Sequence, residues 1–545
     1  MEKIVLIGGK AGLGAARTSI LLGKIFTRMG YYVFNYRDYP SLIRGGHNFN
    51  VLKISTKPVF SHDSNYDAII AFDQLTIDLH EKKLNKDGFI IGDKSLKSDK
   101  LIPLDIDNIV EKVGVKKIFG NNAMIGALLR AMSIDPDEAI VTIEKEFKES
   151  EKAKQVFNIG YDVSEEKTIL EKPDNKPKYF LTGNQAIAAG AIVGGLDIYF
   201  AYPMTPATAV LHHIADMQKK YNVNAVQLED EISVINAALG ASYAGARTMV
   251  GTSGGGFSLM TEAISMQGIT EIPLVVYLSQ RTGPSTGVPT YTEQGDLKFA
   301  LNAGQGEFIR IVVAPGDANE CFYRTAEALY LADKFRTLVI LLGDKHVAED
   351  NYTVEEFSKP ILHDKFIINP NSDYKSYELT STGISPRAVP GQGAVVRASS
   401  YEHDEYGYTV EDEEKVKLMK DKRILKLKPI IEEINKLNPI TVYGTGDNLI
   451  VGWGSTKGAI IDALNELENT RFLQISYISP FPAELVEKEL KNSKNIILIE
   501  NNQTGLLGDI IREKTGIKIE NKLLKYNGRP FTKKEIIDGV SKWLK

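Results

Sequence analysis

The sequence has very little cysteine. Only Cys321 carries a thiol among the 545 residues, so an internal disulfide is excluded. An iron–sulfur cluster normally needs about four thiolates, so any such cluster must lie on another chain. The eight histidines show no metal-ligand spacing, because the adjacent His212 and His213 would face different directions on a helix. The sequence therefore predicts neither a disulfide framework nor a metal site in this chain.

Long apolar runs and an excess of one charge are also lacking. No apolar run reaches about 18 residues, and the N-terminal segment lacks the charged and apolar regions of a signal peptide. The formal net charge of -5, without a strongly basic block, argues against a broad nucleic-acid surface. We therefore expect a soluble cytoplasmic protein that binds neither a membrane nor nucleic acid.

The chain does contain a repeated alternation of buried strands and helical segments, over a length sufficient for about three or four domains. The alternation predicts an α/β domain, a doubly wound parallel-sheet domain, a connecting excursion of loops and a polar helix, and a last α/β domain, over residues 1–175, 180–350, 351–440 and 441–545. Residues 166–178, with two prolines and seven charged residues, have the composition of a linker. The charge run over residues 411–428 is most simply a solvated helix face.

A glycine turn follows the first predicted strand, Ile4–Ile7. Gly9, Gly12 and Gly14 are spaced G-x-x-G-x-G, which departs from both the dinucleotide fingerprint and the P-loop. Such a turn can direct backbone N–H groups at a phosphate, but glycines also serve simple tight turns. A dinucleotide-binding or regulatory protein organised by this loop is therefore one alternative function of the chain.

The polar loops that follow the strands of the second domain are chemically the most suggestive. Residues 202–206, Tyr-Pro-Met-Thr-Pro, end a predicted strand, and we expect Thr205 to be the N-cap of a helix with Pro206 at its first position. Capping explains those two residues completely. It does not explain why Tyr202 and Pro203 stiffen the backbone before the helix, so a backbone shaped around a ligand stays an alternative.

Three consecutive acids, Glu229, Asp230 and Glu231, open a predicted helix with one face formed by Ile232, Ile235, Leu239 and Ser242. A carboxyl group at this place feels two opposing effects, since a helix N-terminus lowers its pKa and an apolar surround raises it. Such a group can be tuned for proton exchange. Alternatively, the acids are there only because the helix dipole favours them.

Arg281 follows the apolar strand 274–278, and the loop behind it carries hydroxyl groups on a proline-stiffened backbone, at Thr282, Ser285, Thr286 and Thr290. A guanidinium group in this setting is suited to binding a carboxylate bidentately. An ordinary surface arginine beside a turn is the alternative. The loop is the best single indication of an anionic substrate.

Taken together, these residues resemble the fused gamma-alpha subunit of the 2-oxoacid:ferredoxin oxidoreductases over almost the whole chain. The motifs are Ile-Arg-Gly-Gly-His-Asn, Tyr-Pro-Met-Thr-Pro, the substrate-type loop, Gly-Asp-Leu and Ala-Pro-Gly, at residues 43–48, 202–206, 281–290, 295–297 and 314–316. The family pattern has isoleucine where Met204 stands, a volume-conserving exchange that we expect to be tolerated. The resemblance implies a gamma-type α/β domain, a pyrimidine-binding thiamine diphosphate domain with a doubly wound parallel sheet, and a transketolase C-terminal-like domain.

The resemblance also implies roles for single residues. Glu231 would be the catalytic carboxyl group that hydrogen-bonds the aminopyrimidine ring of thiamine diphosphate. Gly240, nine positions further along the helix, favours Glu231 over Glu229. Tyr202 and Pro203 would contact the cofactor.

For the substrate, the resemblance implies that Arg281 and Thr290 hold the carboxylate and the oxo group of a 2-oxoacid. Thr205 would contact the substrate or the cofactor. The implied reaction is the coenzyme A-dependent oxidative decarboxylation of the 2-oxoacid, with electrons passed to ferredoxin, a reaction of anaerobic metabolism. Residues 295–306 read like those of 2-oxoglutarate enzymes, whereas pyruvate or branched-chain 2-oxoacids are the alternative substrates.

One half of a thiamine site is missing from the sequence. No Gly-Asp-Gly with a downstream asparagine occurs, and Gly343-Asp344-Lys345 lacks the second glycine. We therefore expect Mg²⁺ and a [4Fe-4S] cluster on a beta subunit, with which this chain would form a hetero-oligomer. The chain should be inactive alone.

Overall fold

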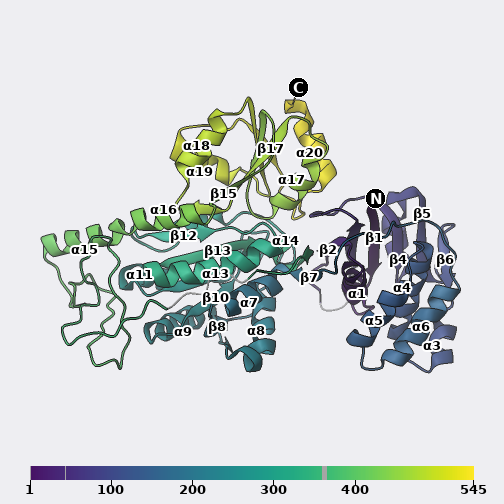
Figure 1. Ribbon diagram of the computed structural model, residues 1–545, viewed down its shortest axis with the longest axis horizontal. Coiled ribbons are helices and arrows are strands. Elements are labelled where there is room, and N and C mark those ends of the chain that lie inside the picture. Colours follow the sequence, from purple (N-terminus) through teal and green to yellow (C-terminus); the bar gives the residue numbers. More distant parts are fainter. Residues whose placement is uncertain (1, 43–44, 359–364, 545) are drawn as a thin grey trace. The chain divides into compact units, whose positions relative to one another are not determined.

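The computed structural model describes residues 2–42, 45–358 and 365–544 and contains three β-sheets flanked by helices (Figure 1). The chain forms two compact units. The first comprises Met1–Leu181, Asp350–Phe357 and Phe531–Ile536, and the second comprises the remainder. Within the described part of the chain, no helix is both long and apolar enough to cross a bilayer.

The first unit is built on an eight-stranded mixed sheet with the order β6-β5-β4-β1-β3-β2-β14-β7. Its strands are β1 (Glu2–Gly9), β2 (Tyr32–Asp38), β3 (Asn48–Ser55), β4 (Tyr66–Ala71), β5 (Leu84–Asp93), β6 (Leu101–Leu104), β7 (Tyr179–Thr182) and β14 (Asn351–Val354). Strands β1, β4, β5 and β6 are parallel, whereas β3 is antiparallel to β1 and β2, and β14 is antiparallel to β2. The sheet is therefore completed by a strand that follows about half of the second unit in sequence.

Helices of the first unit bury apolar side chains against one face of this sheet, because Leu22, Ile25 and Phe26 of α1 share a core with Val5 and Ile7 of β1. The helices are α1 (Ala15–Arg28), α2 (Gln74–His80), α3 (Ile106–Val113), α4 (Gly120–Ala131), α5 (Asp137–Glu146) and α6 (Ser150–Asp162). The linker-like stretch 166–178 contains neither helix nor strand, as predicted.

The second unit contains the predicted doubly wound parallel sheet, with the order β18-β12-β13-β11-β10-β8-β9. Its strands are β8 (Ile198–Ala201), β9 (Asn224–Gln227), β10 (Thr248–Thr252), β11 (Leu274–Gln280), β12 (Arg310–Val313), β13 (Leu338–Asp344) and β18 (Tyr477–Ser479). All neighbours are parallel except β18, which comes from the C-terminal part and pairs antiparallel with β12. The sequence pattern did not indicate β9 or β18.

The helices of this sheet are α7 (Gly183–Val193), α8 (Thr208–Tyr221), α9 (Glu231–Tyr243), α10 (Gly254–Leu259), α11 (Thr261–Thr270), α12 (Leu297–Asn302), α13 (Ala318–Phe335) and α14 (Lys345–Glu349). Every residue of β11 and β13 is buried, as expected for central parallel strands. Alternate residues of the strands, such as Val250, Val276 and Ile340, form one core with the apolar faces of α9, α10 and α11.

The last α/β region has a five-stranded sheet with the order β15-β17-β16-β19-β20. Its elements are β15 (Ile440–Gly444), β16 (Asn448–Gly452), β17 (Thr470–Ile475), β19 (Asn495–Glu500), β20 (Asn521–Leu524), α17 (Thr456–Leu464), α18 (Ala483–Lys491), α19 (Leu506–Thr515) and α20 (Lys533–Val540). Trp453, Leu473 and Leu498 belong to the same hydrophobic core as the parallel sheet. The two sheets therefore share one core in the second unit.

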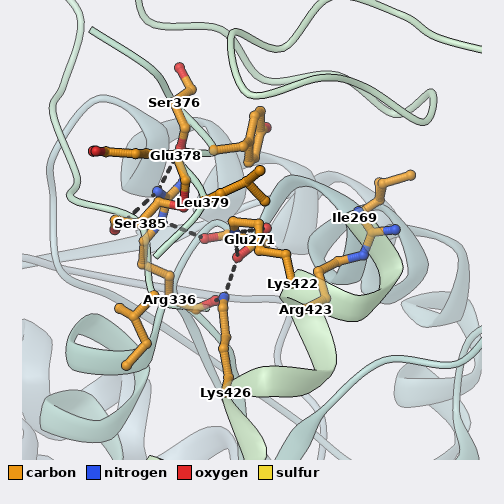
Figure 2. A network of polar contacts seen from close by, with 12 residues as sticks. Ile269, Glu271, Arg336, Ser376, Glu378, Leu379, Ser385, Lys422, Arg423 and Lys426 are labelled. Atoms are coloured by element: carbon orange, nitrogen blue, oxygen red, sulfur yellow. Dashed lines mark hydrogen bonds and ion pairs between the residues drawn. The ribbon is translucent and has the colours of Figure 1, made fainter. Parts of the chain in front are cut away.

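The connecting excursion was expected to begin at residue 351, but residues 351–354 form β14 of the first unit. The excursion contains loops over residues 365–412 and continues with α15 (Glu413–Leu425) and α16 (Leu427–Lys436), which follow one another in Figure 1. The interpretation of residues 411–428 as a solvated helix face is wrong at Lys422 and Lys426, which are both buried. Their ammonium groups converge on the carboxylate of Glu271 (Figure 2). The physical reason is a long-range ion pair, which a local charge pattern does not reveal.

Glu271 ends helix α11 in the left-handed conformation, with φ of 51°. Lys422 Nζ lies 2.7 Å from its Oε1 and 3.0 Å from its Oε2, and Lys426 pairs with Oε2. Arg336 donates to the carbonyl of Ser376 at 2.8 Å, so the same cluster also holds the excursion (Figure 2). Burial alone would raise the pKa of Glu271, but Lys426, Lys422 and Arg336 outweigh burial and keep this pKa far below its usual range.

Candidate functional site

Two predicted site segments and a glycine segment leave the carboxyl ends of three adjacent parallel strands. Strand β10 lies between β8 and β11 in the sheet. Tyr202 and Thr205 follow β8, the glycines from Gly254 to Gly256 follow β10, and Arg281 follows β11. The sheet therefore brings these segments to one edge, where ligands bind in open α/β folds.

The segment after β8 does not begin a helix where the sequence predicted. Helix α8 begins at Thr208, so the expectation that Thr205 is an N-cap and Pro206 the first helical residue is wrong. The backbone is instead used for contacts: the carbonyl of Thr205 accepts from Arg281 Nη1, and that of Pro206 from Asn184 Nδ2, both at 2.9 Å. Tyr202 is 40% exposed. The segment is thus an irregular turn fixed by side chains from neighbouring elements.

Arg281 is half-buried and directly follows β11. One terminal nitrogen is bonded to the carbonyl of Thr205, but Nε is buried without a hydrogen-bond partner among the described residues. Burial lowers the pKa of this guanidinium, and the nearby carboxylate of Asp296 opposes the shift. A cation with an unused donor next to solvent-accessible loops is suited to receive an anionic ligand group.

Thr290 is buried at the base of the loop that follows Arg281. The loop closes on itself, because Thr282 N–H donates to the carbonyl of Tyr291 at 3.1 Å, and Val288 N–H donates to that of Thr282 at 2.9 Å. The guanidinium carbon of Arg529 lies 3.6 Å from the centroid of the Tyr291 ring. The last α/β region therefore supports the loop from behind.

Glu231 is the first residue of α9 and is only 4% exposed. Its neighbours have local partners: Asp230 accepts from Ser233 N–H and Glu229 accepts from the Ser233 hydroxyl, both at 2.7 Å. Glu231 Oε1, by contrast, is buried and has no hydrogen-bond partner in the described chain. Of the two glutamates that the sequence left open, Glu231 is the one held in the interior.

The predicted apolar face of this helix was wrong in one position, since Ile232 is 47% exposed. The buried side chains of α9 are Glu231, Val234, Ile235, Ala238, Leu239 and Ser242. With 3.6 residues per turn, the residue after Glu231 is rotated by about 100° and leaves the buried face. Glu231 itself therefore belongs to the inward-facing stripe.

Two glycines in the first turn of α10 make room for two carboxyl groups. A Cβ atom at Gly256 would lie 2.4 Å from Glu231 Oε1, and one at Gly254 would lie 2.6 Å from Asp296 Oδ2. Thr252 Oγ1 also lies beside Gly256, and it is 3.9 Å from Met204 Sδ. Residues 295–297 form one of the sequence motifs, but their contact with α10 is created only by the fold and could not be predicted.

Asp296 is the second acid that the fold brings to the site. Burial raises its pKa to about 6, although Arg281 acts in the opposite direction. Burial also raises the pKa of Glu293, and Asp296 adds to that shift. Strongly perturbed acids beside an arginine are typical of functional sites. Among the residues that the structure describes, no three histidine, cysteine, aspartate or glutamate side chains are grouped to hold a metal ion.

The glycine turn of the first unit is partly occupied by the protein itself. Lys10 N–H donates to Asp73 Oδ2 at 2.9 Å, so a carboxylate takes a backbone donor that a phosphate would need. This contact disfavours the dinucleotide alternative. Of the motif over residues 43–48, Ile43 and Arg44 lie outside the described residues, while His47 Nε2 lies 2.8 Å from His80 Nε2. The described part of this motif is therefore paired within the first unit.

Two family models match this chain. One, described as pyruvate flavodoxin/ferredoxin oxidoreductase, thiamine diP-bdg, matches residues 189–421. The other, described as pyruvate ferredoxin/flavodoxin oxidoreductase, matches residues 4–163. The first match contains all the strand-end segments described above.

Relatives and a solved structure are similar over most or all of the chain. The 2-oxoacid:ferredoxin oxidoreductase subunit alpha of Saccharolobus solfataricus is 35% identical over 612 aligned residues, covering 98% of this chain and 96% of the relative. A 2-oxoglutarate synthase subunit of Methanothermobacter thermautotrophicus is 29% identical, covering 67% of this chain and 98% of the relative. The structure of 2-oxoglutarate:ferredoxin oxidoreductase from Magnetococcus marinus, with 2-oxoglutarate, coenzyme A and succinyl-CoA bound, matches with a TM-score of 0.92 at 28% identity, covering 100% of both chains.

Proposed function

This chain belongs to the 2-oxoacid:ferredoxin oxidoreductases, as an alpha subunit of the fused gamma-alpha type, and we propose that it acts on 2-oxoglutarate together with a beta subunit. The fold that the resemblance implied, a gamma-type domain, a thiamine-type parallel-sheet domain and a transketolase C-terminal-like domain, is confirmed. The proposed reaction is coenzyme A-dependent oxidative decarboxylation to an acyl-CoA and CO₂, with electrons passed to ferredoxin.

The observation that carries the proposal is the buried carboxylate of Glu231, with one oxygen lacking a partner in the described chain beside a glycine-lined helix turn. A buried oxygen of this kind calls for a ligand that presents an N–H group, because an unpaired buried acceptor costs about 1–3 kcal/mol. The aminopyrimidine ring of thiamine diphosphate has this chemistry, so the residues fit the cofactor. Glu231 would hold the ring at a nitrogen and exchange a proton there.

We assign the remaining cofactor and substrate roles to residues at the carboxyl edge of the parallel sheet. Tyr202, Pro203 and Thr205 would line the cofactor ring, and Thr205 would also reach the substrate. Arg281 and Thr290 would bind the carboxylate and the oxo group of the 2-oxoacid. When bound, thiamine diphosphate supplies the carbon nucleophile and the electron sink, which no side chain of this chain provides.

The partner proteins are part of the proposal. A beta subunit would supply Mg²⁺, the diphosphate site and a [4Fe-4S] cluster, since this chain has one cysteine. Ferredoxin would receive the electrons. The choice of 2-oxoglutarate is supported by the relative named as a 2-oxoglutarate synthase subunit and by the bound 2-oxoglutarate in the similar structure. Pyruvate and branched-chain 2-oxoacids are the competing substrates.

The test is to co-express this chain with its beta subunit and to follow 2-oxoacid- and coenzyme A-dependent dye reduction with 2-oxoglutarate, pyruvate and a branched-chain 2-oxoacid. We expect turnover with thiamine diphosphate present and the highest kcat/KM for 2-oxoglutarate. A purified complex without turnover on any of the three would contradict the proposed function. A preference for pyruvate would contradict only the substrate.

Arg281→Ala in this complex should raise KM for the oxoacid by roughly tenfold or more, since a hydrogen bond to a charged group contributes about 1.5–3 kcal/mol. Arg397→Ala is the control, because its guanidinium packs on the ring of Tyr408 in the excursion and is not part of the strand-end loops. An unchanged KM with a lower Tm would show that Arg281 has only a structural role.

A further inference from the structure

Asp296 is fixed at the candidate site by its backbone, which leaves its carboxyl group available for another role. It precedes α12, and its N–H donates to Gln280 Oε1 at 2.9 Å. Gln280 is fully buried and donates from Nε2 to the carbonyl of Gly343 at 3.1 Å. The residue next to Gln280 is Arg281. The acid and the arginine are therefore held to the same strand end by a buried amide side chain.

The charged groups around Asp296 come from few elements. Arg281 faces it from the end of β11, and Glu293 faces it from the preceding loop. Helix α10 presents Gly254, which has no side chain to titrate and leaves space for Oδ2. A second glycine of α10, Gly256, lies against the carboxyl group of Glu231, which belongs to α9. Arg281 is thus the cation whose charge acts on Asp296, and this acid competes with any other anion that approaches the guanidinium.

A substrate carboxylate on Arg281 brings a second negative charge into the neighbourhood of Asp296. Two carboxylates near one half-buried cation do not both stay ionised easily, because the cation offsets little more than one negative charge, so the binding of one favours protonation of the other. We infer that Asp296 is a substrate-positioning residue that takes up a proton when the oxoacid binds to Arg281. This inference rests on the function proposed for Arg281 above.

Asp296 is the residue that gains the proton. In the free site, the carboxylate of Asp296 offsets part of the positive charge of Arg281. In the occupied site, protonated Asp296 leaves that charge to the substrate. Because burial raises the pKa of Asp296 to about 6, the free acid is mostly ionised at neutral pH and mostly protonated below pH 6. Oxoacid affinity should therefore be high at acid pH and decrease as pH rises above about 6.

The experiment uses the co-expressed complex and measures kcat and KM for 2-oxoglutarate from pH 5.5 to 8.5. For the wild-type complex, we expect KM to rise above about pH 6, by at most about tenfold per pH unit for one linked proton. Asp296→Asn should give a low KM that is nearly independent of pH, because the amide cannot ionise. Its kcat profile should keep the shape of the wild type.

Glu293→Gln is the matched control, since it removes a neighbouring acid of the same loop and should leave the pH dependence of KM in place. A sloping KM profile in Asp296→Asn, or a flat one in Glu293→Gln, would overturn the inference. Calorimetric titration of 2-oxoglutarate in two buffers of different ionisation enthalpy counts the protons taken up, with about one expected at pH 7.5 for the wild type and none for Asp296→Asn. A wild-type complex without turnover would instead overturn the proposed function.

Discussion

Two buried glutamates of the second unit stand at opposite helix ends and differ in their surroundings. Glu231 begins α9 and is 4% exposed, whereas Glu271 ends α11 and is 2% exposed. The carboxylate of Glu271 is bonded to Lys422 and Lys426 with Arg336 nearby (Figure 2). The carboxylate of Glu231 has one oxygen without a partner in the described residues and a glycine beside it.

The difference in hydrogen-bond partners distinguishes Glu271, an acid with a structural role, from Glu231, the acid to which we assign a ligand. A buried charge lowers stability unless its hydrogen-bonding positions are satisfied, and native proteins leave few such positions unmet. At Glu271 the chain meets these needs itself and joins α11 to the excursion. At Glu231 it leaves Oε1 without a partner in the described residues, which supports the proposal that a bound group supplies the contact. Burial alone would not distinguish these two residues; their partners do.

The largest expected effect is on turnover at Glu231. Glu231→Gln should lower kcat of the complex by about 10²- to 10⁴-fold, the usual range for loss of a general acid or base, while leaving assembly and Tm nearly unchanged. Steady-state dye reduction and thermal unfolding measure the two effects. Glu229→Gln is the control, because that exposed acid bonds only to Ser233. Equal losses in both variants would remove Glu231 from the mechanism.

The next effect is on stability at Glu271. Glu271→Gln should lower the free energy of unfolding by about 3–5 kcal/mol, because it leaves buried lysines without their counter-charge. The fraction that remains folded should keep its kcat. Urea unfolding followed by circular dichroism measures the change, and the exposed Glu262→Gln in the same helix should shift it by less than about 0.5 kcal/mol.

A loss of turnover without a loss of stability in Glu271→Gln would reverse the comparison between the two glutamates. It would place Glu271, instead of Glu231, among the residues that act on the substrate. The same reversal would follow if Glu231→Gln unfolded the chain and Glu271→Gln did not.

The smallest expected effect is a dependence on acid pH. The folded pKa of Glu271 lies below its ordinary value of 4.5, so the unfolded state binds the proton first as pH falls. Its contribution to stability is therefore complete above about pH 5 and decreases below it, by at most about 1.4 kcal/mol per pH unit. Urea unfolding of the wild type and of Glu271→Gln at pH 6 and pH 3.5 should show that the difference between their free energies of unfolding is smaller at pH 3.5. An equal difference at the two pH values would mean that Glu271 is not ionised in the folded protein.

Much of the parallel sheet was predictable because its strands are continuous apolar runs bounded by turn residues, as at 198–201, 248–252 and 274–278. The site followed from the same rule, since residues after parallel strands meet at one edge. Glu231 could be placed at a helix start from its position among three acids. That its oxygen lacks a partner could not be predicted, because this depends on the approach of Gly256 from another element.

The remaining features depend on contacts between residues that are distant in sequence. Lys422 and Glu271 are separated by 151 positions, so the local charge pattern gave only a solvated face. Helix α8 begins after Pro206 because Arg281 and Asn184 bind the preceding carbonyls, and neither interaction is visible in the motif itself. Asp296 appeared as part of a motif, but its role depends on a glycine 42 positions earlier, where the missing side chain provides the space.

The position of β14 in the sequence determines when the sheet of the first unit is completed during synthesis. Strand β14 covers β2, and residues 350–357 leave the ribosome only after the whole parallel sheet except β18 has been synthesised. Until then β2 presents an open row of backbone donors and acceptors, the kind of edge that pairs with other chains. A chain truncated after residue 181 would lack β14 and would leave that edge of β2 open. The sheet of the first unit is therefore complete only after residue 354 has been synthesised.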